Sequence, residues 1–308
     1  MKQVEERYIS LLTDFGFKRI FGTAINKDLL ICFLNSLFNG RQVVKDVKYL
    51  NPEHVGDVYT DRRAIFDVYC EGENGEKFIV EMQNAYQTYF KDRALFYSTF
   101  PIREQAPKGN DWDFKLNHIY TVALLNFNMN EDAFDKEKIR HHVQLCDTAT
   151  HKVFYDKLEY IYVEISKFNK SLEQLDTLYE KWLYALKNLY KLTQRPKELC
   201  DKVFDRLFEE AEIAKFTPQE MREYETSKMA YRDIKNSVDT AKREGIEIGM
   251  KQGREEGRAE GMNLRSLEIA RKMLAKGMDE ASIMDMTGLT AEEIKLLKAE
   301  ILMTNITI

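Results

Sequence analysis

The feature that most constrains the fold of this chain is a pair of β-prone segments separated by a short turn. Ala64–Cys70 and Lys77–Gln83 flank the dipeptide Asn74-Gly75, which is typical of hairpin turns. A two-residue turn at this dipeptide would place the carboxylates of Asp67 and Glu81 on opposite faces of the sheet. A three-residue loop that begins one residue earlier, with its glycine left-handed, shifts the pairing by one residue.

The three-residue loop, Glu73–Gly75, gives the hairpin one wholly apolar face. In that register Asp67 lies opposite Glu81, and Gln83 follows two residues further along the same side. A slip by one residue would bury a carboxylate against the core, which is costly without a partner. We therefore expect the three-residue loop and these apolar pairs: Phe66 with Met82, Val68 with Val80, and Cys70 with Phe78.

Two carboxylates on neighbouring strands, with Cβ atoms about 5 Å apart, repel each other unless a cation lies between them. Hard oxygen ligands such as Asp67 and Glu81 suit Mg²⁺ or Mn²⁺, which keep several waters and complete their coordination with a phosphate. Such an ion activates water and neutralises charge on a phosphate, which is the chemistry of phosphodiester hydrolysis. A pair of solvated acids on an exposed hairpin is the alternative interpretation.

The wider pattern predicts an α/β fold with a mixed sheet, in the order helix, three strands, helix and strand. Two further β-like segments and a helical extension follow. In chain order we expect helices within Leu11–Gly22 and Asp28–Asn39, strands at Val43–Leu50, Ala64–Cys70 and Lys77–Gln83, a helix at Tyr86–Gln105, a strand covered on both faces at Asn117–Phe127, β-like pieces at Val143–Leu145 and Tyr160–Ile165, and helices over Leu172–Tyr190 and Pro196–Val238, with a helix start at Thr217–Glu220.

Several motifs follow one another in a specific order: Asp14-Phe15-Gly16-Phe17-Lys18, Phe66-Asp67-Val68, Val80-Glu81-Met82-Gln83, Arg93 to Tyr97, and Gln105. This order resembles the PD-(D/E)XK nuclease-type transposases, also called recombination-promoting nucleases (Rpn). The likeness covers most of the chain, including its glycine-spaced tail. It implies a restriction-endonuclease-like core with a helical C-terminal extension, dependence on a divalent metal, and cleavage of DNA.

The resemblance also assigns roles within the hairpin. It implies that Asp67 and Glu81 bind the metal, helped by the main-chain carbonyl of Met82. Gln83 stands where the wider superfamily has lysine, as is common in the transposase-like branch. An amide can orient the attacking water but supplies no positive charge, so the charge must come from the metal or from Lys91 or Arg93 on the next helix. The proline that usually precedes the aspartate is replaced here by phenylalanine.

Other polar residues have two interpretations each. Asp14 and Lys18 can point at the site from the first helix, or serve as a helix cap and a surface lysine. Tyr97, on an amphipathic helix, is more typical of a core residue, and Gln105 carries a weaker signal still. The pair His141-His142 has no third ligand nearby, and adjacent side chains on a strand point in opposite directions, so we expect it to be structural.

The composition points to a reducing compartment. The cysteines Cys32, Cys70, Cys146 and Cys200 are isolated and lack metal-ligand spacing, so we expect buried free thiols. No stretch approaches the ~20 apolar residues that span a bilayer, and the first residues lack the layout of a signal peptide. We expect a cytoplasmic protein without a membrane segment. The formal charge of -5 does not indicate nucleic-acid binding, although it leaves room for a local basic groove.

The end of the chain is organised differently. Glycines recur every four residues from Gly245 to Gly261 among charged residues, which suggests either close helix contact in a homo-oligomer or a loosely helical, charged linker. Residues 264–298 then resemble a helix-turn-helix, although the acidic last helix favours an oligomerisation or protein-binding bundle. We expect a nuclease-like core at 1–170, a helical extension at 171–240 and the glycine-spaced helix with its tail at 241–308.

These patterns favour a Mg²⁺-dependent endodeoxyribonuclease linked to recombination, transposition or defence, with DNA as its partner. The rival hypothesis is a catalytically inactive DNA- or protein-binding module that keeps the nuclease fold. Gln83 and the negative net charge favour the rival, whereas the retention of both Asp67 and Glu81 favours the enzyme. An RNA nuclease is a third reading, because the metal chemistry is the same.

Overall fold

The computed structural model describes residues 6–54, 64–106, 113–129 and 135–306. The chain divides into two compact units, Met1–Ser237 and Val238–Ile308. Residues 171–237, in the stretch expected to form a helical extension, belong to the first unit and contribute Trp182, Phe204 and Tyr224 to its main hydrophobic core.

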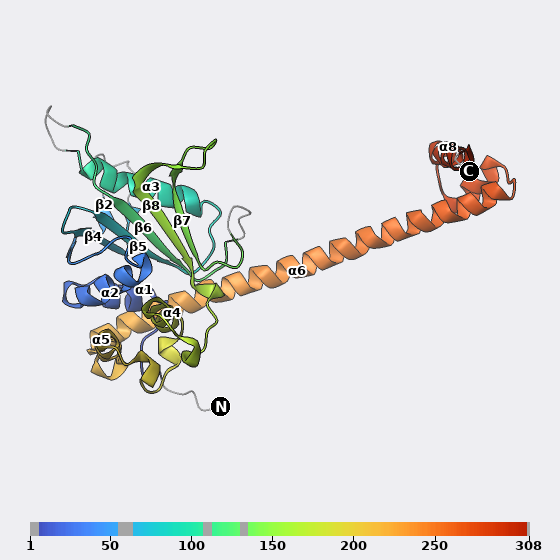
Figure 1. Ribbon diagram of the computed structural model, residues 1–308. Coiled ribbons are helices and arrows are strands. Elements are labelled where there is room, and N and C mark those ends of the chain that lie inside the picture. Colours follow the sequence, from blue (N-terminus) through green and yellow to red (C-terminus); the bar gives the residue numbers. More distant parts are fainter. Residues whose placement is uncertain (1–5, 55–63, 107–112, 130–134, 307–308) are drawn as a thin grey trace. The chain divides into compact units, whose positions relative to one another are not determined.

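The first unit is built on a six-stranded mixed sheet (Figure 1). Its strand order is β1-β4-β5-β6-β8-β7, in which β5, β6 and β8 run parallel to one another, while β1 with β4, β4 with β5, and β7 with β8 are antiparallel. The predicted α/β fold with a mixed sheet is confirmed. The strands are β1 (Val47–Tyr49), β4 (Val68–Gly72), β5 (Lys77–Gln83), β6 (Ile119–Leu125), β7 (Arg140–Cys146) and β8 (Val153–Glu164), while β2 (Glu53–His54) and β3 (Ala64–Ile65) form a separate small ladder.

The predicted hairpin register is confirmed. Val68 pairs with Val80, and Cys70 pairs with Phe78, which is the pairing set by a three-residue loop. Gly75 is left-handed, with φ of 82°. A left-handed residue at this point adds one residue to the loop, and so keeps the even-numbered apolar side chains of β5 on the core face.

Phe66 corrects one part of the predicted register. It does not join Met82 on the core face but packs with Tyr69 and Ile79 in a cluster on the opposite face. The ladder between β4 and β5 begins only at Val68, so the alternation of side chains does not extend back to residue 66. The sequence pattern predicted that Phe66 and Asp67 belong to the regular pairing of β4 with β5, but both residues lie before that pairing begins.

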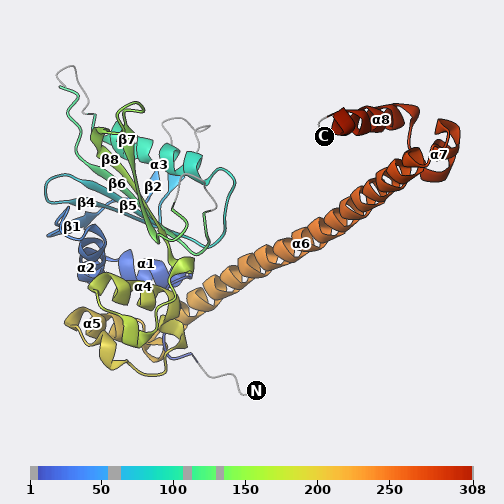
Figure 2. The same cartoon turned by 45° about the vertical axis from the view of Figure 1, so that its right-hand side comes forward.

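Helices cover both faces of the sheet (Figures 1 and 2). On one face lie α1 (Asp14–Phe21), α2 (Lys27–Phe38), α4 (Leu178–Asn188) and α5 (Lys202–Glu210), which share the main core with the sheet. On the other face lies α3 (Phe90–Glu104), packed through Phe90 and Ala94 against β6 and β8. Every residue of β6 is buried, which confirms the strand predicted to be covered on both faces.

Local contacts explain where elements are shorter than predicted. The strand expected at Val43–Leu50 reduces to β1, because the side-chain amide of Asn35 binds both main-chain groups of Val44 at 2.8 Å and takes the place of a ladder partner. Helix α3 begins at Phe90 rather than at Tyr86, and Pro101 lies inside it. The helix start at Thr217 is confirmed by reciprocal hydrogen bonds with Glu220, at 2.8 and 3.2 Å.

The unit Val238–Ile308 holds the rest of α6 (Pro218–Ala275), followed by α7 (Glu280–Thr287) and α8 (Ala291–Ile306). Gly288 is left-handed and ends α7, and Thr290 forms a capping box with Glu293. The glycine-spaced segment is helical throughout, and a Cβ atom added at any of its glycines would meet open space. A small core forms from Ala270, Met273, Ile283, Leu289, Ile294 and Leu297.

The cysteines differ from expectation. Cys70 is buried, as predicted, and Cys32 is half-buried, whereas Cys146 and Cys200 are exposed. Cys146 ends an outer strand of the sheet, and Cys200 lies in the short connection before α5, where neither is covered by the core. The prediction of buried thiols is therefore wrong for these two residues. All four side chains are free thiols.

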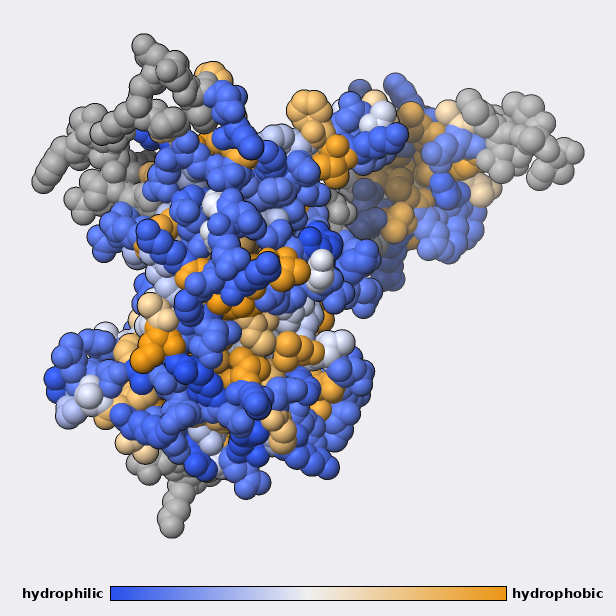
Figure 3. Space-filling model, turned by 60° about the vertical axis from the view of Figure 1, so that its left-hand side comes forward, coloured by the Kyte–Doolittle hydropathy of each residue, from blue (hydrophilic) through white to orange (hydrophobic). Residues whose placement is uncertain are grey.

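On the face shown in Figure 3, hydrophilic residues predominate and apolar residues lie in scattered patches among them. Among the helices that the structure describes, none is by itself both long and apolar enough to cross a membrane, and one bent pair, Asp14–Phe21 with Ala24–Phe38, meets these criteria only when the two are taken together.

Candidate active site

The end of the β4–β5 ladder brings the two predicted carboxylates together. Asp67 stands immediately before β4, at the point where the main-chain pairing with β5 stops. Its carboxylate Oδ2 accepts a hydrogen bond from the main-chain nitrogen of Met82 at 2.8 Å. Its own main-chain nitrogen donates to Glu81 Oε1 at 3.2 Å. The aspartate side chain thus replaces one ladder bond, and this replacement fixes it beside Glu81.

Both carboxylates are withdrawn from water. Glu81 is 6% exposed and the Asp67 side chain 19%. Burial raises the pKa of Glu81, and the charge of Asp67 raises it further. Burial likewise raises the pKa of Asp67, against the opposing effects of the Met82 hydrogen bond and the Lys18 charge. The pair therefore holds its negative charge at a cost that a nearby cation would remove.

Helix α1 contributes the first cation. Lys18 Nζ lies 2.7 Å from Asp14 Oδ1 and 3.9 Å from Asp67 Oδ1, so this lysine approaches the carboxylate pair. Asp14 is exposed in the first turn of the helix, where it pairs with Lys18, and its charge also raises the pKa of Asp67. The cap of α1 is Thr13, whose hydroxyl accepts from the nitrogen of Gly16, so the interpretation of Asp14 as a helix cap is wrong.

Helix α3 contributes the second cation, which is Arg93. Its guanidinium lies 3.9 Å from Glu81 Oε2 and 4.8 Å from the ring centroid of Tyr97. Lys91 is exposed two residues earlier on the helix, and residues two apart do not share a helix face. Tyr97 packs against Phe66, with ring centroids 5.3 Å apart, so it contributes to a core while it supports the arginine.

Gln83 lies on the same side as Glu81, as the register predicted, and its Nε2 donates to Glu81 Oε2 at 3.2 Å. The next residue, Asn84, donates to the carbonyl of Leu12 at 2.7 Å and accepts from Asn126 at 3.3 Å. Neither asparagine was predicted to lie at the site. Their positions in the sequence could have indicated it, because each directly follows a buried strand, and the carboxyl ends of the parallel strands β5 and β6 meet at one edge of the sheet.

The oxygen atoms at this edge fit a hard divalent cation. The two carboxylates come from neighbouring strands, and the carbonyl of Met82 points to the same side as its N–H group, which meets Asp67. Within the described residues no group of three His, Cys, Asp or Glu side chains is arranged for metal binding. A cation here would therefore be held by two carboxylates, a carbonyl and water, which is the coordination that Mg²⁺ favours.

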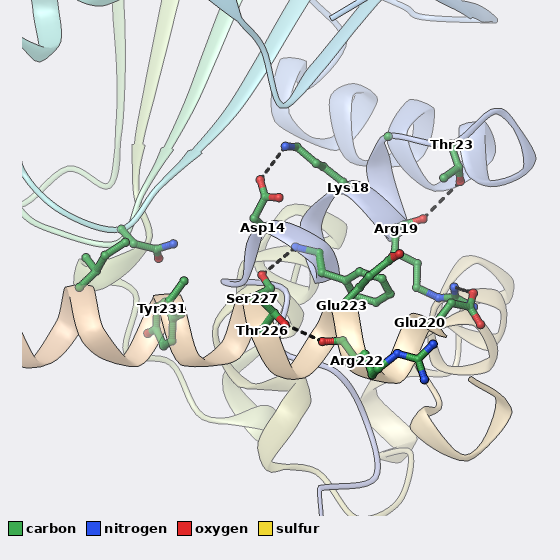
Figure 4. Close-up of a pocket in the computed structure, with 15 residues that line it drawn as sticks. Asp14, Lys18, Arg19, Thr23, Glu220, Arg222, Glu223, Thr226, Ser227 and Tyr231 are labelled. Carbon is green, nitrogen blue, oxygen red and sulfur yellow. Dashed lines mark hydrogen bonds and ion pairs between the residues drawn. The ribbon is translucent and has the colours of Figure 1, made fainter. Parts of the chain in front are cut away.

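A cleft of about 860 Å³ is lined in part by Lys18, the lysine that approaches Asp67 (Figure 4). One wall is α1, with Asp14 and Lys18, and the other is the first part of α6, within the unit Met1–Ser237. Asn84 lines it from the end of β5. The cleft thus shares Lys18 and the strand end with the site, and extends it toward α6.

Comparison with known protein families decides the affiliation. Residues 11–241, more than half of the chain, match the model of the PD-(D/E)XK nuclease family transposases. The chain belongs to this family. Comparison with curated proteins and with solved structures gives no significant match. The matched residues span the sheet, the carboxylate pair and the part of α6 that lines the cleft.

A second family model matches the tail of this PD-(D/E)XK family member. Residues 263–299 match the C-terminal HTH domain of the Rpn/YhgA-like nuclease family, which confirms the predicted helix-turn-helix likeness. Within this segment the last helix, α8, uses Lys298 to bind Glu280 at 2.5 Å and Glu300 to bind Arg271 at 2.8 Å. That α8 serves a protein-binding or oligomerisation bundle stays a prediction.

Gln105, His141 and His142 each bind other groups of the fold. Gln105 accepts from the main-chain nitrogen of Asn117 at 2.6 Å, and so it fixes the entry to β6. His141 and His142 point in opposite directions, as expected. His141 meets Glu164 at 2.8 Å, whereas His142 meets the Arg41 guanidinium at 2.8 and 3.0 Å. Both histidines therefore have partners of their own in the fold.

Proposed function

We propose that this protein is an endodeoxyribonuclease that hydrolyses DNA phosphodiester bonds with Mg²⁺ or Mn²⁺. The observation that carries the proposal is the buried pair Asp67 and Glu81, whose charges repel each other at the edge where the strands end. A buried like-charge pair is costly, and it is retained where a cation uses it. The family affiliation supplies the nuclease context.

Each residue of the site has a separate task in this proposal. Asp67, Glu81 and the carbonyl of Met82 would hold the cation, which lowers the pKa of a bound water and polarises the phosphate. Gln83, already bonded to Glu81, would accept or donate one hydrogen bond to the attacking water and orient it. The amide carries no charge, so it does not stabilise the phosphate electrostatically.

Two cations would supply the charge that Gln83 lacks. Lys18 and Arg93 approach the carboxylate pair from opposite helices, each at 3.9 Å. Both side chains can donate hydrogen bonds to a scissile phosphate at this site, on the oxygens where negative charge develops. The guanidinium is held over the ring of Tyr97, which limits its motion.

DNA is the partner that these features favour. The C-terminal helix-turn-helix match supports DNA binding, and the family name points to recombination, transposition or defence against foreign DNA. The glycine-spaced part of α6 would serve a homo-oligomer, and the absence of a membrane-crossing helix among the described residues is compatible with a cytoplasmic site of action.

One observation favours the rival function, a catalytically inactive DNA- or protein-binding module. Lys18 and Arg93 already offset part of the negative charge of Asp67 and Glu81 without any metal. In such a module these ion pairs would hold α1 and α3 against the strand ends, and the fold would serve assembly alone.

Nicking of a supercoiled plasmid separates these readings. We expect the wild type to nick the plasmid with Mg²⁺ or Mn²⁺ and to lose this activity in the presence of a chelator. Asp67→Ala should be inactive, whereas Glu73→Ala, which removes an exposed carboxylate from the loop of the same hairpin, should retain wild-type activity. Equal nicking by wild type and Asp67→Ala would refute the site. A folded, metal-binding wild type that does not nick would favour the inactive module.

A further inference from the structure

The cleft between α1 and α6 has walls whose charges cancel. Lys18 pairs with Asp14 at 2.7 Å, and Arg19 pairs with Glu220. Arg222 and Glu223 add one charge of each sign. The lining is therefore neutral as a whole, and a phosphate would find little to attract it away from Lys18 at the mouth of the cleft.

Apolar side chains form the surface between these charges. They are Phe15 on α1 and Ala230, Tyr231 and Ile234 on α6. The polar groups among them are already occupied locally, since Ser227 accepts from the nitrogen of Phe15 at 3.0 Å and Thr226 donates to the carbonyl of Arg222 at 2.9 Å. Such a lining offers contact area and an aromatic face, but few hydrogen bonds that would recognise one particular ligand.

The ring of Tyr231 is tied to the strand ends that carry the site. Its hydroxyl accepts from Asn126 Nδ2 at 3.3 Å, and the same amide donates to Asn84 Oδ1 at 3.3 Å. Asn84 directly follows Gln83. This chain of hydrogen bonds fixes the aromatic ring relative to β5 and β6, so the ring would face a ligand in one orientation.

We propose that this cleft receives an unpaired base of the nucleic-acid strand that is cut, with the base stacked on Tyr231. The inference rests on the proposed nuclease function, because it takes the phosphodiester at Asp67 and Glu81 as the neighbouring point of the strand. The volume of about 860 Å³ lies within the usual range for small-molecule sites and accommodates a nucleoside. Neutral, apolar walls suit a base, while Lys18 at the mouth suits the backbone phosphate.

The proposal has a consequence for substrate choice. A base can enter the cleft only when it is unpaired, so single-stranded or locally melted DNA should bind better than a closed duplex. Stacking on an aromatic ring tolerates any base, because every base has a flat π surface. The site would therefore select strand state rather than sequence.

The test measures binding of the full-length chain to a labelled oligothymidine and to the matching dA·dT duplex, by fluorescence anisotropy with a chelator present. Tyr231→Ala should weaken single-strand binding by about 5- to 100-fold, the range found for loss of one stacked base. Tyr231→Phe keeps the ring but loses the hydrogen bond from Asn126, so it should retain more single-strand binding than Tyr231→Ala. Phe154→Ala removes an exposed aromatic ring on β8, away from the cleft, and serves as the matched control.

A second variant guards against a folding defect in Tyr231→Ala. Ala230→Glu places a negative charge in the cleft at an exposed helical position, where glutamate is well tolerated, and it should also weaken single-strand binding selectively. Unchanged single-strand binding in both variants would overturn the proposal, as would an equal loss for strand and duplex. If these substitutions released a bound protein and left DNA binding unchanged, the cleft would be a protein-docking groove, and the proposal would again be overturned.

The failure of this inference and the failure of the proposed function are separable. Binding is measured without metal, so it does not depend on cleavage. If nicking requires Asp67 but single-strand binding does not require Tyr231, only the base-binding role of the cleft is refuted. Single-strand binding that requires Tyr231 in a protein that never nicks DNA would refute the nuclease alone.

Discussion

Glu81 and Glu164 are two buried glutamates near the carboxyl ends of β5 and β8, the strands on either side of β6. The Glu164 side chain is 0% exposed and has three donors close to it. His141 lies 2.8 Å from one oxygen, Lys167 lies 2.8 Å from the same oxygen, and the nitrogen of Met129 donates to the other at 2.7 Å. Its charge is matched by hydrogen bonds within the fold.

Glu81 has a different environment. Its neutral donors lie at 3.2 Å, the guanidinium of Arg93 lies 3.9 Å away, and a second carboxylate, that of Asp67, stands beside it. A buried charge without full compensation is costly to keep. The difference separates two kinds of buried acid, because a fully paired carboxylate supports the fold, whereas an incompletely paired one is suited to bind a cation.

The largest expected effect is on cleavage. Asp67→Asn keeps the size of the side chain and removes one of the two charges, so we expect nicking to fall by at least about 10³-fold, in line with the loss of a metal ligand or a key electrostatic group. The free energy of unfolding should stay the same or rise, because the repulsion with Glu81 disappears. Nicking rates and chemical denaturation measure the two quantities, and a strongly destabilised variant would contradict the comparison.

At Glu164 we expect the opposite result, a loss of stability with little change in cleavage. Glu164→Ala leaves Lys167 and His141 without their shared partner, and we expect the free energy of unfolding to fall by about 3–5 kcal/mol, the usual cost of removing one member of a buried ion pair. The folded fraction should nick DNA at close to the wild-type rate. Urea denaturation gives the stability, and a variant of normal stability without activity would reverse the two roles.

The pH dependence of stability should separate metal-free from metal-bound protein. Burial raises the pKa values of Glu81 and Asp67, so between the ordinary and the raised values the folded protein binds more protons than the unfolded chain. The free energy of unfolding of the metal-free protein should therefore fall as pH rises through that window. Asp67→Asn should flatten this slope. Denaturation curves across pH check it, and stability that rises with pH in this window would exclude the raised pKa values.

Metal binding should oppose the same loss of stability. A cation that binds only the folded state stabilises it by about 2.7 kcal/mol at a concentration one hundred times its Kd. The gain from Mn²⁺ should increase with pH, because the ion competes with protons for the carboxylates. Thermal melts with and without Mn²⁺ at several pH values measure this gain, and an equal gain in Asp67→Asn would place the ion elsewhere.

The smallest effect is expected at Arg93. Arg93→Gln removes a cation that faces Glu81 without touching the metal ligands. We expect nicking to fall by about 10- to 100-fold, because charge on the phosphate loses one stabilising partner. Mn²⁺ affinity should stay the same or increase, since the arginine competes with the ion for the carboxylate. Reduced Mn²⁺ affinity with an unchanged cleavage rate in saturating metal would refute this role.

The hairpin shows which features of the fold can be predicted from the sequence and which cannot. The glycine at 75 and the apolar residues at even positions of β5 were enough to predict the register, because period-two alternation ties every side chain to one choice. They could not predict Phe66, because the ladder stops before it and the Asp67 side chain takes over a hydrogen bond that the main chain would otherwise make.

Contacts between segments far apart in the chain could not be predicted from the sequence. Periodicity could not choose between Lys91 and Arg93, because the choice depends on which side of α3 faces Glu81. The same holds for the cleft, since α1 and α6 are some two hundred residues apart and meet only through contacts such as that of Ser227 with Phe15. The position of Asn84 and Asn126 at one sheet edge could have been predicted, because both follow strands that run parallel.

The most direct test of the central claim is a count of bound Mn²⁺ by electron paramagnetic resonance, which detects the free ion in the presence of protein. Wild type, Asp67→Asn and the matched control Glu73→Ala are titrated at one pH. We predict one site in the wild type and in Glu73→Ala, with affinity reduced by at least about 10-fold in Asp67→Asn. Equal Mn²⁺ affinity in all three proteins would contradict the claim that Asp67 and Glu81 hold the metal.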